Sequence, residues 1–61
     1  MKTLRTLIED ATIGRTTPLK IDTGEAILRG YWYNDHILKL MDRRVESYRK
    51  TDDGIMVIVL V

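Results

Sequence analysis

Cysteine is absent from this chain, and histidine occurs only once. Without cysteine there is no disulfide and no thiolate metal site, and one histidine cannot form an imidazole cluster. The chain has 61 residues, and a domain of this size buries only about 60% of the surface that its unfolded chain exposes. We therefore expect one marginally stable domain, residues 1–61, for which self-association is the remaining reinforcement.

A strong excess of charge is also missing. The chain has ten basic and nine acidic side chains, and a net charge of +1 is too small to indicate nucleic acid binding by itself. Residues 29–50 hold six basic and three acidic side chains, so this stretch is locally +3 (6 − 3). We expect a modest basic surface there.

Targeting and membrane-spanning segments are not evident. The amino end, MKTLRTLIED, meets acidic residues after one short amphipathic segment, unlike a signal peptide. The apolar run at residues 55–61 is far shorter than the roughly 20 residues that a membrane-spanning helix needs. We expect a cytoplasmic protein with no membrane partner, and the lack of cysteine fits a reducing compartment.

A helix is predicted near the amino end, over residues 3–10. Thr3 is a suitable N-cap residue, and Gly14 is a suitable stop. The apolar residues between them follow the spacing i, i+3, i+4 and i+7 of one helical stripe. They are Leu4, Leu7, Ile8 and Ala11.

Two hairpins are predicted in the rest of the chain. Residues 19–22 alternate between apolar and polar types, and residues 26–33 resume after a turn with β-branched and aromatic character. Residues 45–50 alternate again, and Asp53-Gly54 before residues 55–61 is the strongest short-range hairpin signal.

A second, short helix is expected between the hairpins, because Asn34 and Asp35 can cap it and an apolar flank follows. The predicted fold class is α+β. The amino-terminal helix packs across one face of a four-stranded antiparallel sheet, in the order helix, two strands, short helix, two strands.

Aromatic and basic side chains are predicted to gather on one face of this sheet, because side chains alternate along a strand. In residues 26–33 the core face is Ala26, Leu28, Gly30 and Trp32. The opposite face would carry Arg29, Tyr31, Tyr33, Arg44, Tyr48 and Lys50. Such residues are typical of protein interfaces, but they also stack and neutralise single-stranded nucleic acid, and they occur on ordinary sheet surfaces.

The terminal run is apolar at every position, which indicates a strand covered on both faces. In one interpretation it is a central strand, with residues 55, 57, 59 and 61 beneath the helix. The self-association residues on the opposite face would then be Met56, Ile58 and Leu60. In the other interpretation it is an edge strand that pairs with its own copy. Both interpretations predict a homodimer.

No catalytic or metal site is predicted. His36 lies beside Asp35 without a nucleophile in a recognisable context, so we interpret it as a solvated residue at a helix start. Asp52 and Asp53 are too few ligands for a calcium loop and fit turn chemistry better. Gly30 is unusual inside a strand, where glycine marks a bulge or a close backbone approach. We expect no catalytic residues, no metal and no cofactor.

The layout of TLRTLIEDA, then PLKIDTGEAILRGYWYND, then RVESYRKTDDGIMVIVLV resembles a loose class of small proteins. These are accessory proteins of bacteriophages and integrated elements of Gram-positive bacteria, in which a short helix precedes a few strands and the chain stops in a V-x-I-x-V type strand. The resemblance implies a cytoplasmic protein that binds a host or phage component, and it includes inhibitors of host defence systems.

The leading hypothesis is a non-enzymatic protein-binding homodimer. Its candidate contacts are Arg29, Tyr31, Tyr33 and Tyr48, with Arg43 and Arg44 steering an acidic partner. The alternatives are a nucleic-acid-binding regulator that uses the same face, and a sponge for a small nucleotide signal held between subunits.

Overall fold

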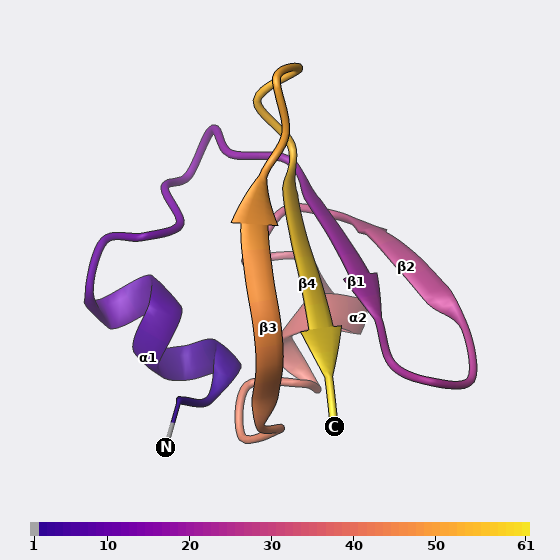
Figure 1. Ribbon diagram of the computed structural model, residues 1–61. Coiled ribbons are helices and arrows are strands. Elements are labelled where there is room, and N and C mark those ends of the chain that lie inside the picture. The colour runs from indigo at the N-terminus through magenta and orange to yellow at the C-terminus, as the bar shows by residue number, and fades with distance from the viewer. Residues whose placement is uncertain (1) are drawn as a thin grey trace.

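A four-stranded mixed sheet forms the centre of the fold. The computed structural model describes residues 2–61. Its elements are α1 (Leu4–Glu9), β1 (Leu19–Asp22), β2 (Ile27–Gly30), α2 (Asp35–Leu38), β3 (Val45–Lys50) and β4 (Met56–Leu60). The strands lie in the order β2-β1-β4-β3 (Figure 1). The α+β class with a four-stranded sheet is confirmed.

The prediction of an all-antiparallel sheet is wrong. Each hairpin is antiparallel, since β1 pairs with β2 and β3 pairs with β4. The hairpins join through β1 and β4, which run parallel with Ile21 opposite Ile58. The first strand of one hairpin thus lies beside the second strand of the other. β4 is therefore a central strand, and β2 and β3 are the edges.

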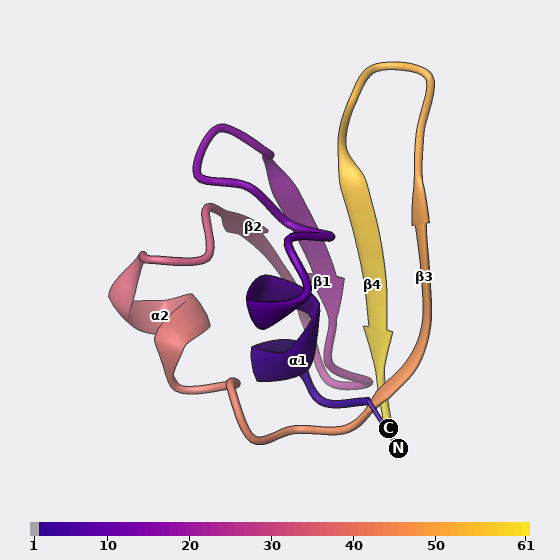
Figure 2. The same ribbon diagram turned by 90° about the vertical axis from the view of Figure 1, so that its left-hand side faces the viewer.

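Both helices contribute to one core on one side of the sheet. Figure 2 shows α1 in front of the sheet, and α2 supplies the fully buried Ile37 to the same cluster. No helix among residues 2–61 is long and apolar enough to cross a membrane. The buried core residues are Leu4, Leu7, Ile13, Leu19, Ile21, Ile37, Met41, Met56, Ile58 and Leu60.

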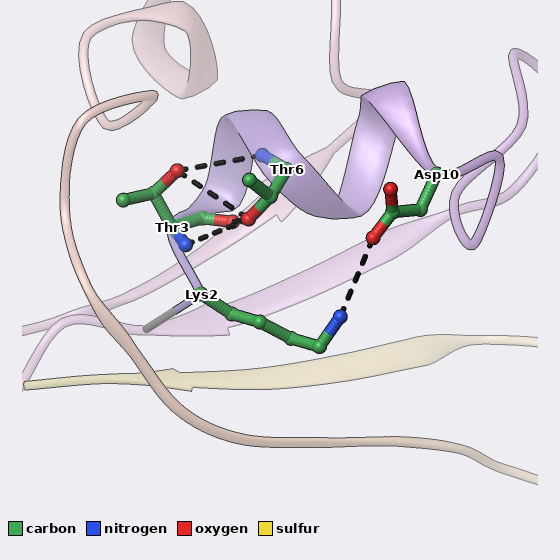
Figure 3. Close-up of polar contacts among 4 residues, drawn as sticks. All are labelled: Lys2, Thr3, Thr6 and Asp10. Atoms are coloured by element: carbon green, nitrogen blue, oxygen red, sulfur yellow. Dashed lines mark hydrogen bonds and ion pairs between the residues drawn. The ribbon is translucent and has the colours of Figure 1, made fainter.

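Helix α1 begins with the predicted cap. The Thr3 side chain accepts a hydrogen bond from the backbone N–H of Thr6, and the Thr6 hydroxyl accepts one from the Thr3 N–H (Figure 3). This reciprocal arrangement satisfies backbone donors that the first turn leaves unpaired. The helix ends earlier than Gly14, because Ala11 adopts a positive φ of 61° and the N–H groups of Thr12 and Ile13 both bond the Leu7 carbonyl.

β2 is shorter than predicted and ends at Gly30. The φ of Gly30 is +148°, and a Cβ built there would lie 2.5 Å from Asn34 Oδ1 and 3.2 Å from His36 Nε2. Asn34 Oδ1 accepts the N–H of Tyr31 at 2.7 Å and so makes no side-chain cap bond to α2. Gly30 is therefore required by a close side-chain approach, and residues 31–33 belong to a turn.

The predicted faces of the terminal strand are inverted. Met56, Ile58 and Leu60, proposed from the sequence as a self-association face, are at most 4% exposed and lie in the core beneath the helices. Val57 and Val59 point to the other side and are half-buried. An unbroken apolar run has no polar position to mark its outer face, so its sequence cannot assign the faces.

Candidate functional site on the open face of the sheet

The sheet has a second face that the helices do not cover, here called the open face. Leu19 and Ile21 are buried against the helices, so alternation places the other β1 side chains on the opposite side. The pairing register extends this assignment across the sheet. The open face consists of Lys20, Asp22, Ile27, Arg29, Ser47, Arg49, Val57 and Val59.

One row across the open face is rich in positive charge. The register aligns Arg29 of β2 with Lys20 of β1, Lys20 with Val57 of β4, and Val57 with Arg49 of β3. Adjacent strands lie about 4.8 Å apart, so this row is about 14 Å long. We call Arg29, Lys20 and Arg49 the cation row.

These three cations lack ion-pair partners within the described part of the chain. The salt bridges between residues 2 and 61 are Lys2 with Asp10 at 3.3 Å and Arg5 with Asp42 at 3.1 Å. The open face contains three cations and one carboxylate, Asp22, for a local charge of +2 (3 − 1). The Asp22 carboxylate accepts the Gly24 N–H at 2.9 Å in the adjacent turn.

Aliphatic side chains occupy the middle of the open face. Val57 and Val59 are half-buried, and the register places Lys20 and Arg49 on either side of Val57. Lysine and arginine stems cover apolar surface while their charged ends stay in water. Ile27 on the β2 edge is 55% exposed. The face therefore mixes apolar and basic side chains, with Arg29 and Arg49 on the edge strands and Lys20 beside Val57 on the central strands.

A cavity of about 250 Å³ lies at one end of the cation row. Lys20 and Arg29, the two cations at this end of the row, are among its lining residues, together with Tyr31. The remaining lining residues are Pro18, Leu19, Gly30 and Ile55. The cavity thus brings two cations next to apolar surface.

The turn after β2 holds Tyr31 in place. Its N–H donates to Asn34 Oδ1, and its carbonyl accepts the N–H of Asn34 at 3.0 Å. Its ring stacks on Tyr33 with 5.7 Å between centroids and 6° between planes, and Arg15 lies 5.8 Å from the Tyr33 ring centroid. His36 is exposed as expected, but its Nε2 lies 2.8 Å from the Arg29 carbonyl and fixes the end of β2.

The six predicted partner-binding residues do not share one face. Arg29 lies on the open face, but Tyr31 and Tyr33 lie in the turn, where strand alternation no longer applies. Tyr48 is opposite the buried Ile58 and thus on the helix side of the sheet, at the exposed β3 edge. Arg29 and Tyr31 come together at the cavity, and Tyr31 stacks on Tyr33 in the turn.

The two remaining predicted arginines, Arg43 and Arg44, contact other parts of the chain. Arg43 donates to the carbonyl of Val61 at 3.1 Å and reaches the carbonyl of Thr23 at 3.5 Å, so it ties the end of the chain to the first hairpin. Arg44 is exposed and pairs with Thr3 in an isolated bridge. Neither residue belongs to the cation row.

Sequence reasoning missed Lys20, Arg49 and Val57. The alternation of residues 19–22 placed Lys20 opposite the core, but Lys20 gains its significance from its neighbours on β2 and β4. Those neighbours depend on the parallel pairing of β1 with β4, which has no local signal. Tyr48 and Lys50 were expected on the face of Arg29 in place of Arg49, because the faces of β3 follow those of β4, which the sequence does not assign.

Among residues 2–61, no three histidine, aspartate or glutamate side chains are grouped so that they could hold a metal ion. Comparisons of the chain with protein-family models, with curated proteins and with solved structures gave no significant match. The open face is therefore the feature of the molecule that bears on function.

Proposed function

We propose that this chain is a non-enzymatic binding protein whose open face docks on an acidic surface of a partner protein. The observation that carries the proposal is the cation row, in which Arg29, Lys20 and Arg49 flank Val57 without a carboxylate within salt-bridge distance among the described residues. Carboxylates of a partner would supply the missing charges, and arginine binds them with two parallel hydrogen bonds.

The distribution of apolar and charged groups supports a protein partner. Protein interfaces have an apolar centre with a polar rim, and the open face places Val57, Val59 and Ile27 among charged side chains. Face-to-face packing of two copies would bring cations toward cations, which opposes self-pairing of this face. An acidic partner fits the charge of the face better than a second copy does.

Nucleic acid is the less favoured ligand. Proteins that bind single strands stack the bases on aromatic side chains beside a positive groove. The strand positions of the open face are aliphatic, charged or, at Ser47, a hydroxyl, and Tyr48 lies on the opposite side of the sheet. Tyr31 is the aromatic residue that borders this face, at the cavity.

The resemblance to phage and mobile-element accessory proteins suggests that the partner is a host or phage protein. An inhibitor of a host defence protein in the cytoplasm would act in this way, by covering a surface of its target. The charge of the open face supports the acidic character of such a partner.

A binding titration tests the proposal. The probe is a fluorescein-labelled copolymer of glutamate and alanine, and fluorescence anisotropy reports its affinity at low salt. Arg49→Gln is expected to weaken binding about three- to fivefold, the effect of losing one exposed charge pair. Lys50→Gln is the matched control, because Lys50 is next in the same strand but lies on the helix side.

Two outcomes would count against the proposal. Equal losses in Arg49→Gln and Lys50→Gln would mean that charge alone, without the open face, determines binding. Tighter binding of an oligothymidylate that carries the same number of charges would favour the nucleic-acid alternative.

A homodimer remains part of the proposal, but it requires a different surface from Met56, Ile58 and Leu60. The Thr51 N–H bonds the Ile55 carbonyl, so the backbone groups of Thr51 point toward the strand of β4. Along an antiparallel strand these groups point alternately toward the partner and away from it, so those of Tyr48 and Lys50 point away from β4. Figure 2 shows this outer side of β3 at the margin of the sheet. We propose that a second copy pairs along this edge.

Proline substitutions at neighbouring positions test edge pairing. Tyr48→Pro removes an outward N–H and is expected to leave the fold intact while giving a monomer. Ser47→Pro removes an inward N–H and is expected to destabilise the fold. Light scattering at micromolar concentration measures the assembly, and a monomeric unsubstituted protein contradicts the homodimer.

A further inference from the structure

We propose that the cavity at the end of the cation row binds a phosphate monoester attached to a planar or apolar group. The cavity has a volume of about 250 Å³ and is lined by Lys20, Arg29, Tyr31, Ile55 and Pro18, among others. It therefore places two cations beside apolar and aromatic surface. This ligand site goes beyond the docking of an acidic protein.

The arrangement of Lys20 and Arg29 is the first argument. They are directly opposite in the register. The Thr23 N–H bonds the Ala26 carbonyl, so residues 23 and 26 form a hydrogen-bonded pair. Hydrogen-bonded and non-hydrogen-bonded pairs alternate along the ladder, so Lys20 and Arg29, three positions away, form a non-hydrogen-bonded pair. Side chains are closest at such pairs, with Cα atoms about 4.5 Å apart. Like charges directly opposite each other destabilise a sheet. A bound anion would turn this repulsion into attraction.

The charge of the ligand follows from the number of cations. A phosphate monoester carries about −1.5 to −2 charges at neutral pH, whereas a carboxylate carries one. Two cations without a carboxylate partner among residues 2–61 match a dianion best. Arginine also presents a planar fork of donors that suits phosphate oxygens, and lysine adds a point charge.

The size and lining of the cavity define the rest of the ligand. Its volume of about 250 Å³ is small beside the roughly 300–1,000 Å³ of pockets for drug-sized ligands. Ile55 and Pro18 give it apolar walls, and Tyr31 adds an aromatic one. The Tyr31 ring also stacks on the Tyr33 ring, with 5.7 Å between their centroids. A phenyl ring or a nucleobase matches this surface.

Two common molecules share this chemistry, namely a nucleoside monophosphate and a phosphotyrosine side chain. The test therefore uses both sources, as uridine monophosphate and as N-acetyl-phosphotyrosine amide. Phenyl phosphate is the minimal probe. Inorganic phosphate lacks its ring, phenol lacks its phosphate, and benzoate has a singly charged carboxylate in place of the phosphate. NMR titration of the ¹⁵N-labelled full chain measures the affinities.

Phenyl phosphate is expected to shift the amide signals of Lys20, Gly30, Tyr31 and Ile55 and to bind at least about tenfold more tightly than inorganic phosphate or phenol. Either of the two larger compounds binding in the same place supports the proposal, and the tighter one identifies the source. Equal affinity for benzoate, or shifts elsewhere on the molecule, overturns it.

Substitutions separate this site from the proposed protein surface. Arg29→Gln and Lys20→Gln are each expected to weaken phenyl phosphate binding about tenfold or more, with amide spectra that otherwise match the unsubstituted protein. Arg49→Gln is expected to leave it unchanged, because Arg49 lies at the far end of the cation row, outside the cavity.

The failure of one proposal is thus distinguishable from the failure of the other. Loss of copolymer binding in Arg49→Gln with intact phenyl phosphate binding supports both. Absence of phenyl phosphate binding, with copolymer binding retained, overturns the cavity alone.

Discussion

Replacing Gly30 with alanine tests the junction between the sheet and the turn that carries Tyr31. The φ of Gly30 is +148°, a conformation that costs a residue with a Cβ about 1–3 kcal/mol. The new Cβ would lie 2.5 Å from Asn34 Oδ1, so Asn34 must move and its bond to the Tyr31 N–H, worth about 1 kcal/mol, is lost. The expected loss of unfolding free energy is about 2–4 kcal/mol.

This loss is large for so small a protein. At about 0.05–0.15 kcal/mol per residue, 61 residues give an unfolding free energy of about 3–9 kcal/mol. Each kcal/mol shifts the Tm of a domain of this size by about 4–8 °C, so Gly30→Ala is expected to lower the Tm by about 8–32 °C. Thermal unfolding followed by circular dichroism measures the shift.

Gly24→Ala is the matched control. Gly24 also has a positive φ, +90°, but a Cβ there meets nothing within 4 Å. Its replacement is expected to cost about 1–2 kcal/mol, from backbone conformation alone. If Gly30→Ala lowers the Tm no more than Gly24→Ala does, the reasoning about Asn34 is refuted.

A double-mutant cycle isolates the contact with Asn34. In an Asn34→Ala background the side chain that meets the new Cβ is gone, and the Tyr31 N–H bond is already lost. Gly30→Ala is then expected to cost about 1 kcal/mol less than it does alone. Additive losses in the cycle would show that the two residues do not interact.

Three further tests of the fold use four substitutions and urea unfolding. Thr3→Ala removes the hydroxyl that accepts the Thr6 N–H, while the bond from the Thr3 N–H to the Thr6 hydroxyl stays. It is expected to cost about 0.5–2 kcal/mol, so an unchanged midpoint would contradict the capping role. Ile58→Ala leaves a cavity in the core and is expected to lower the unfolding free energy by about 2–5 kcal/mol. Val59 is its half-buried neighbour on the open face, and Val59→Ala is expected to cost less. The reverse order would mean that the β4 faces are assigned wrongly. Arg5→Gln breaks the exposed pair with Asp42 and is expected to change stability by less than about 1 kcal/mol, and a larger loss would show an unrecognised role for Arg5.

Local signals in the sequence predicted the elements well. Thr3 caps α1, the two hairpins form where turn residues separate alternating strands, and a short helix follows Asn34. Each of these features depends on residues a few positions apart. The end of β2 was missed because the Gly30 conformation depends on the side chains of Asn34 and His36.

The arrangement of the sheet was harder to predict because it is set by distant residues. The parallel pairing of β1 with β4 joins segments more than thirty residues apart, such as Ile21 and Ile58. The side chains of the apolar run in β4 also have two different roles, and these cannot be read from the sequence of this strand alone. Its inner side chains fill the core, and outer ones such as Val57 lie between the stems of Lys20 and Arg49.

The candidate site was also only partly predictable from the sequence, because it too depends on distant residues. Arg29 was identified from the sequence, but of the six basic residues between 29 and 50 only Arg29 and Arg49 lie on the open face. The other members of the cation row become neighbours only through the register of the assembled sheet. Tyr48 was assigned to the same face as Arg29, yet it lies on the helix side because it is opposite Ile58.

The most direct test of the central claim is to observe which arginine side chains contact an acidic ligand. NMR resolves the Nε–Hε signals of individual arginines during titration with the unlabelled glutamate–alanine copolymer. If the open face binds the acidic ligand, the signals of Arg29 and Arg49 shift together and saturate with one affinity, while those of Arg43 and Arg44 stay in place. Shifts confined to Arg43 and Arg44, or equal shifts in all arginines, would contradict a binding surface on the open face.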